Sequence, residues 1–117
     1  MMRNPDAKHI DFRDLIGVMG KMLPSNIDMI LEHNGQFLVG EWKREGEAIS
    51  MGQKILLRQL ACQEKFIVLV IQGNTDDGVM VVEKIWRMQG NGDLKLIGDS
   101  VDRLKEILRH WKEKVGH

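Results

Sequence analysis

The sequence has almost no cysteine, no long apolar run and no net charge, and each shortage excludes a class of protein. A single cysteine among 117 residues, Cys62, rules out an internal disulfide framework and suits a reducing compartment. No apolar run approaches the roughly 20 residues that span a bilayer, and the first residues lack the hydrophobic core of a signal peptide. We therefore expect an intracellular, cytoplasmic protein without a membrane partner.

The charges balance, with 17 Lys and Arg residues against 17 Asp and Glu residues. A protein that binds DNA without sequence preference usually carries a basic excess, so the overall charge counts against that class. An enzyme with a local basic patch remains compatible with it. At this length, and with 43% hydrophobic residues, the chain is predicted to form one domain over 1–117.

A hairpin within 26–43 is the feature around which the chain is organised. Two apolar, β-branched runs flank Asn34-Gly35, the strongest short signal for a two-residue type I′ turn. This turn predicts a register in which Asp28 faces Glu41, with Lys43 on the same side of the sheet. Two facing carboxylates repel each other, and a hard divalent cation between them is the most economical explanation.

Hydrophobic periodicity predicts the other elements. In chain order these are a helix over 11–22, a helix over 50–63, a strand over 66–71, strands over 79–88 and 94–97, and a helix that begins at Asp99-Ser100. Both faces of the hairpin are largely apolar, so the sheet must be covered on both sides. The helix between the hairpin and the next strand predicts that the two strands it connects are parallel. The sequence thus predicts an α/β fold, a mixed sheet flanked by helices.

The set Asp28…Glu41-Trp42-Lys43, on a hairpin followed by a helix and a strand, resembles the PD-(D/E)xK nuclease superfamily in its compact RecB-like, VRR-type and Holliday-junction-resolvase-like forms. The resemblance covers roughly 11–72 and implies a restriction-endonuclease-like α-β-β-α-β core, to which 79–115 adds strands and a helix. It implies Mg²⁺, for which Mn²⁺ can substitute, held by Asp28, Glu41 and the backbone carbonyl of Trp42. Lys43 is then the catalytic cation.

The implied substrate is DNA, and small phage and mobile-element nucleases are comparable in size. One core cuts one strand, so cutting both strands or resolving a junction implies a homodimer. The sequence departs from the family pattern at the residue before Asp28, where Ile27 stands in place of Pro and Pro24 lies four residues upstream of Asp28. The chemistry fits independently, because phosphodiester hydrolysis needs a hard cation and positive charge near the scissile phosphate.

The segment after the motif adds polar and basic candidates. Gly52-Gln53 resembles the Gln-bearing helix start of RecB-like and VRR-type modules, in which the Gln positions the motif Lys or the DNA backbone, although Leu57 stands where the fuller pattern has Tyr. Ser50-x-x-Gln53 is equally a helix capping box, and both roles can hold together. The basic residues Arg44, Lys54 and Arg58 predict a rim for a phosphate backbone, and a solvated helix face is the alternative.

Three other interpretations stay open. The chain can be a non-catalytic nucleic-acid-binding or assembly module that keeps a nuclease-like fold. It can present a surface hairpin whose Glu41 and Lys43 are solvated, or be an unrelated α/β protein in which Asp28 and Glu41 point to different faces. Asp11 and Asp14 are candidates either for the site or for helix capping, and the apolar stripe of the last helix either packs on the sheet or forms a dimer seam.

Overall fold

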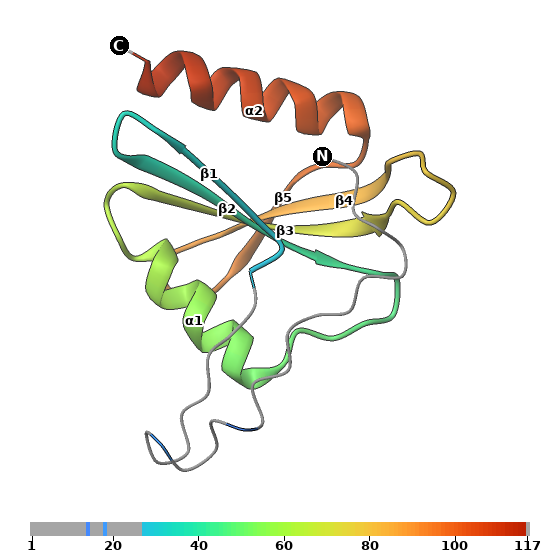
Figure 1. The fold of residues 1–117 in the computed structure, drawn as a ribbon, viewed down its shortest axis with the longest axis horizontal. Helices are drawn as coiled ribbons and strands as arrows, with labels where there is room; N and C mark the ends of the chain where they lie inside the picture. The colour runs from blue at the N-terminus through green and yellow to red at the C-terminus, as the bar shows by residue number, and fades with distance from the viewer. Residues whose placement is uncertain (1–13, 15–17, 19–26, 117) are drawn as a thin grey trace.

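The computed structural model describes residues 14, 18 and 27–116, within which five strands form one mixed sheet in the order β1-β2-β3-β4-β5. Figure 1 shows α1 and α2 on opposite faces of this sheet. The elements are β1 (Met29–His33), β2 (Gln36–Lys43), α1 (Met51–Ala61), β3 (Phe66–Asn74), β4 (Val81–Met88), β5 (Leu94–Gly98) and α2 (Val101–Val115). The α/β class and the mixed, helix-flanked sheet are confirmed. The predicted helix over 11–22, with Asp11, lies outside the described residues except for Asp14 and Val18, which are exposed.

The turn between β1 and β2 has the geometry that the sequence predicts. Asn34 and Gly35 both have positive φ, 52° and 78°, as the two central residues of a type I′ turn require. β1 and β2 pair antiparallel from His33 opposite Gln36 to Met29 opposite Gly40, which is the predicted register. The same register places Asp28, one residue before β1, opposite Glu41.

Replacing Gly35 by alanine should destabilise the fold by about 1–2 kcal/mol, because an L residue with a Cβ is strained at positive φ. Space is not the reason, since nothing lies within 4 Å of a Cβ built at Gly35. Gly52 in α1 is the matched control: its Cβ also meets nothing within 4 Å, and helical alanine is preferred there by up to about 1 kcal/mol. Urea unfolding should therefore shift in opposite directions for the two variants, and a common shift would contradict the turn assignment.

The centre of the sheet is the parallel pair β2–β3, connected through α1 as predicted. The α2 face of the sheet carries one core cluster, whose buried members are Leu38, Leu69, Ile71, Val82, Ile85, Leu104, Trp111 and Val115. The α1 face carries a second, whose buried members are Val39, Leu57, Val68, Val70 and Met88. β3 runs three residues further than the predicted strand over 66–71 and ends at Asn74.

The buried side of α1 differs from the one that hydrophobic periodicity indicates. Periodicity predicts that Met51, Ile55, Leu56 and Leu60 supply much of the buried side. Leu56 and Leu60 are half-buried, but Met51 and Ile55 are 73% and 56% exposed, and the fully buried residue is Leu57. The reason is that the stripe facing the sheet begins with Gln53, which is polar and whose side chain bonds to two residues of β2. Leu57 lies four residues after Gln53, so both point to the same face of α1, the one that packs on the sheet. This face is polar at Gln53 and apolar at Leu57.

α2 packs with the apolar stripe predicted for it, burying Leu104, Trp111 and Val115 against the sheet. The Ser100 side chain caps its start by accepting a hydrogen bond from the Arg103 amide. Its end meets the hairpin turn, where the Asn34 side-chain amide donates to the Val115 carbonyl at 2.8 Å. No helix within the described part of the chain is long and apolar enough to cross a membrane.

Candidate active site

Glu41 is a buried acid near the end of β2, with a relative exposure of 4%. Burial raises its pKa above the ordinary value of 4.5, and the negative charge of Asp28 raises it further. Lys43 and Gln53 act in the opposite direction, through charge and hydrogen bonds, but do not cancel the first two effects. The structure therefore holds Glu41 close to a second acid in an environment that resists its ionisation.

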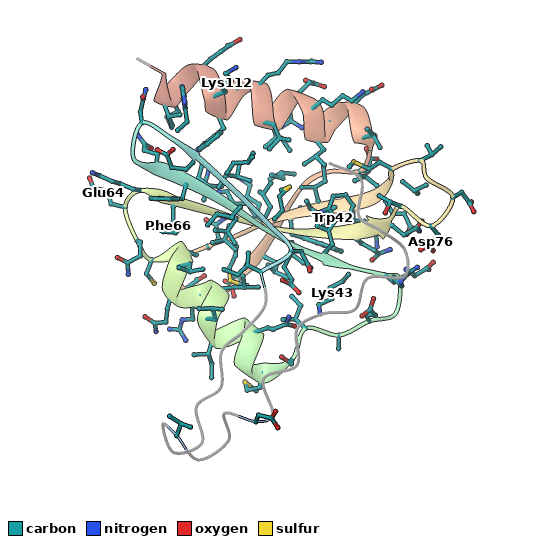
Figure 2. The ribbon with its side chains drawn as sticks, in the orientation of Figure 1. Trp42, Lys43, Glu64, Phe66, Asp76 and Lys112 are labelled. Carbon is teal, nitrogen blue, oxygen red and sulfur yellow. The ribbon has the colours of Figure 1, made fainter. Side chains whose placement is uncertain are left out.

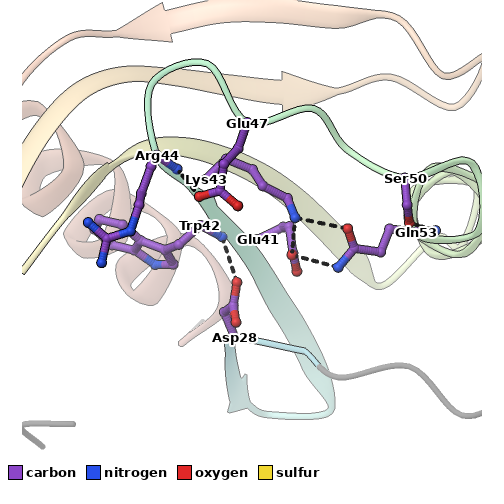
Figure 3. Close-up of polar contacts among 8 residues, drawn as sticks. All are labelled: Asp28, Glu41, Trp42, Lys43, Arg44, Glu47, Ser50 and Gln53. Carbon is purple, nitrogen blue, oxygen red and sulfur yellow. Dashed lines mark hydrogen bonds and ion pairs between the residues drawn. The ribbon is translucent and has the colours of Figure 1, made fainter. Parts of the chain in front are cut away.

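The side chains of Glu41, Lys43 and Gln53 form a closed triangle (Figure 3). The Gln53 amide nitrogen Nε2 donates to Glu41 Oε1 at 2.8 Å, while the Gln53 oxygen Oε1 accepts from Lys43 Nζ at 3.0 Å. Lys43 Nζ lies 3.4 Å from the same Glu41 oxygen. A neutral amide suits this position because it offers one donor to the carboxylate and one acceptor to the ammonium.

The start of α1 supplies Gln53, and the two sequence interpretations of that residue can now be separated. Ser50 is the N-cap, and its hydroxyl accepts from the Gln53 backbone N–H at 3.2 Å. The Gln53 side chain, which would return to the N-cap in a full capping box, instead reaches Glu41 and Lys43. The serine half of the box thus holds the helix start, and the glutamine half belongs to the site.

Asp28 approaches the site from the edge of β2. Its Oδ2 accepts from the backbone N–H of Trp42 at 2.9 Å, in place of a β1 backbone carbonyl. The N–H and C=O of one strand residue point to the same neighbour, so the Trp42 carbonyl is directed to the side of Asp28 as well. Figure 2 shows the Lys43 side chain on the α1 side of β2 and the Trp42 side chain toward the other face. Asp28, Glu41, Lys43 and the Trp42 backbone are therefore together.

The three basic residues expected to form a rim do not join this group. Arg44 forms an ion pair and hydrogen bond with Asp76, in the loop between β3 and β4. The aliphatic part of Arg58 lies against the β4–β5 turn, where a Cβ built at Gly92 would come within 3.3 Å of Arg58 Cδ. Lys54 is exposed, and its side chain makes no hydrogen bond or ion pair within the described residues. A phosphate-binding rim formed by these three residues stays a prediction.

Asp76 was not identified from the sequence as a partner of Arg44, because 32 residues separate the two. The hydrogen bond between the two side chains, together with their opposite charges, lowers the pKa of Asp76 and raises the pKa of Arg44. Both side chains are exposed, so the pair contributes little to stability and mainly ties the connector after β2 to the β3–β4 loop. Hydrophobic pattern and turn composition carry no signal for such a long-range surface pair.

Among the described residues, no group of three or more His, Cys, Asp and Glu side chains gathers as a metal site. Within that part of the chain, the acids that gather at the site are Asp28 and Glu41. Comparison of the chain with protein-family models, with curated proteins and with solved structures finds no match.

Proposed function

We propose that this chain is a Mg²⁺-dependent DNA endonuclease with a restriction-endonuclease-like core. The observation that carries the proposal is the arrangement of Asp28, Glu41 and Lys43: two acids brought together at the end of a hairpin, with an ammonium 3.4 Å from the buried one. An antiparallel hairpin, a helix that starts at the site and a parallel third strand support the proposal, because the family resemblance implies these elements.

The donors present fit Mg²⁺. This cation takes one or two carboxylates, retains several waters and therefore needs no cage of three protein acids. The hydrogen bonds and ion pair described for Glu41 all use Oε1, which leaves Oε2 as the oxygen that can face a cation shared with Asp28. The charge of Asp28 raises the pKa of Glu41, and a divalent cation would relieve this repulsion. Asp28, Glu41 and the Trp42 carbonyl would hold the ion.

When bound, Mg²⁺ would polarise a phosphoryl oxygen and lower the pKa of a coordinated water. Lys43 supplies positive charge where negative charge develops on the scissile phosphate. Gln53 fixes the direction of the Lys43 ammonium and occupies Glu41 Oε1, so that neither side chain needs to reorganise during the reaction. Ligation needs the ionised form of Glu41, so the raised pKa of Glu41 makes metal binding weaken as the pH falls through that pKa.

One such site cleaves one strand. Cutting both strands of a duplex, or two arms of a junction, would require a second copy of the chain, and we include a homodimer in the proposal for that reason. A non-catalytic module that binds nucleic acid or assembles with other proteins is the second candidate, and the zero net charge favours it.

Nicking of supercoiled plasmid and of branched DNA separates the two candidates. The wild-type protein should cut these substrates in the presence of Mg²⁺ or Mn²⁺ and show no cleavage in EDTA. Asp28→Asn and Lys43→Ala should each lower the rate by about 100-fold or more, since each removes a group that stabilises the transition state by several kcal/mol. Glu47→Gln, an exposed acid on the connector after β2 whose Oε1 accepts from the Arg44 amide, is the matched control and should cut normally. Activity that survives both site substitutions would refute the assigned site.

A further inference from the structure

The α1 face of the sheet continues beyond the candidate site as two neighbouring rows of side chains. Strand register defines the rows, because residues paired across adjacent strands point to the same face. The first row runs from β2 to β5 through Glu41, Val70, Trp86 and Leu96, and the second runs from β2 to β4 through Lys43, Gln72 and Lys84. Both rows therefore begin at the candidate active site and lead toward the sheet edge formed by β5.

α1 covers only part of these rows. Val70 is buried in the cluster beneath the helix, and Trp86 packs against that cluster while remaining partly exposed. Beyond them, Lys84 is exposed and Leu96 is 57% exposed. Figure 1 shows β4 and β5 on the far side of the sheet from β1, with α1 beneath its face. The outer end of each row is thus exposed, and the second row connects it with the site through the half-buried Gln72.

The open part combines a cation, an aromatic ring and an apolar side chain. Lys84 Nζ lies over the Trp86 ring, 5.9 Å from its centroid. The two rows contain two ammonium groups, on Lys43 and Lys84, about 10 Å apart if two strand spacings separate them. The only carboxylate in the two rows is that of Glu41, inside the site. A negatively charged chain with flat rings fits this surface, since backbone charge meets lysine while a base stacks on tryptophan.

We propose that Lys84, Trp86 and Leu96, here the β4–β5 platform, bind an unpaired nucleotide of the strand that occupies the candidate active site. Lys84 contacts its phosphate, and its base lies on the apolar surface of Trp86 and Leu96. Bases within a duplex are stacked on one another, so only an unpaired base can present its face to Trp86. The inference rests on the proposed nuclease function and narrows its substrate to nucleic acid with a single-stranded segment beside the cut, such as a flap or branch.

Fluorescence anisotropy in EDTA, without cleavage, tests the platform. The labelled probes are a blunt duplex and the same duplex with a single-stranded DNA or RNA tail. Lys84→Glu and Trp86→Leu should each weaken binding of tailed probes by about tenfold or more, and leave the blunt duplex within about twofold. The matched control is Lys95→Glu: Lys95 is exposed on the same β4–β5 hairpin, but pairs with Arg87, which lies on the α2 face.

Trp86 is partly in the core, so the thermal unfolding of each variant should be measured together with its binding. If Trp86→Leu folds poorly, the result for Lys84→Glu decides the test, because Lys84 is exposed. Equal binding of tailed and blunt probes by the wild type, or equal loss in Lys84→Glu and Lys95→Glu, would overturn the platform. Failure of the platform proposal can be distinguished from failure of the nuclease proposal. Cleavage of DNA with Mg²⁺ without a preference for tailed probes would refute the platform alone. Binding of tails through Lys84 without any cleavage would refute the nuclease function and leave the platform supported.

Discussion

Substitution of Glu41 by glutamine is expected to abolish Mg²⁺-dependent cleavage and, at pH 7, to make the fold more stable. The loss of activity follows from removal of an anionic ligand that the proposed reaction needs, at a cost of several kcal/mol in transition-state stabilisation, or about 1000-fold in rate. The gain in stability follows from the raised pKa: burial and the charge of Asp28 disfavour the ionised form of Glu41 more than Lys43 and Gln53 favour it. Glutamine removes this charge and keeps the shape of the side chain and its contact with Gln53.

The pH dependence gives this prediction its sign. The pKa of Glu41 is raised in the folded state above its ordinary 4.5, so folding favours the protonated acid. The corresponding stability is fully present below pH 4.5 and is lost as the pH rises through the higher folded-state pKa. The difference in unfolding free energy between Glu41→Gln and the wild type should therefore grow over this window and then level off.

Urea unfolding at several pH values, with and without Mg²⁺, provides the measurement. Mg²⁺ should stabilise the wild type by mass action and leave Glu41→Gln unchanged. Glu47→Gln again serves as the control, because its carboxylate lies in an exposed loop. A stability difference that is flat with pH would contradict the assigned state of Glu41, and normal cleavage by the variant would contradict its role as a ligand.

Replacing Lys43 by methionine should destabilise the protein by about 2 kcal/mol at pH 8, and less at pH 5. Removing one partner of a buried ion pair leaves the other charge uncompensated, at a cost of about 3–5 kcal/mol when both groups are fully buried. The 16% exposure of the Lys43 side chain reduces this figure. At low pH, Glu41 takes up a proton and no longer needs the ammonium, so the penalty declines.

A double-mutant cycle tests this interpretation of the pair. In the Glu41→Gln/Lys43→Met protein no buried charge is left unpaired, so most of the stability lost in Lys43→Met should return. The coupling should shrink between pH 8 and pH 5. Effects of the two substitutions that simply add, at every pH, would show that the 3.4 Å contact between the two side chains has no energetic weight.

Local sequence signals predicted the hairpin and the last helix because the responsible interactions are local. Two consecutive residues that accept positive φ determine the β1–β2 turn, and the period-2 alternation of a strand carries that register as far as Asp28 and Glu41. The stripe of α2 is apolar along its length, so its periodicity gives the buried face directly.

The failures of prediction occur where polar residues take structural positions. Hydrophobic periodicity cannot place Gln53 on the buried side of α1, since its partners lie 10 and 12 residues away on another element. Local patterns also do not predict the ion pair of Arg44 with Asp76, because 32 residues separate the two. The same holds for the position of Arg58 beside the β4–β5 turn. A role of either residue at a phosphate backbone stays a prediction.

The position of Gln53 in the first turn of α1 couples the site to helix fraying. Terminal turns open more readily than helix centres, and each opening that releases Gln53 also leaves Glu41 and Lys43 with one partner fewer. A cation bound at the site should shift this equilibrium toward the closed first turn. By linkage, closing of the turn raises the affinity for the cation by the same free energy. Amide hydrogen exchange in the first turn of α1 would then report whether a cation is bound at Asp28 and Glu41. The Ser50 cap, which holds the Gln53 amide, sets how often this turn opens when no cation is bound.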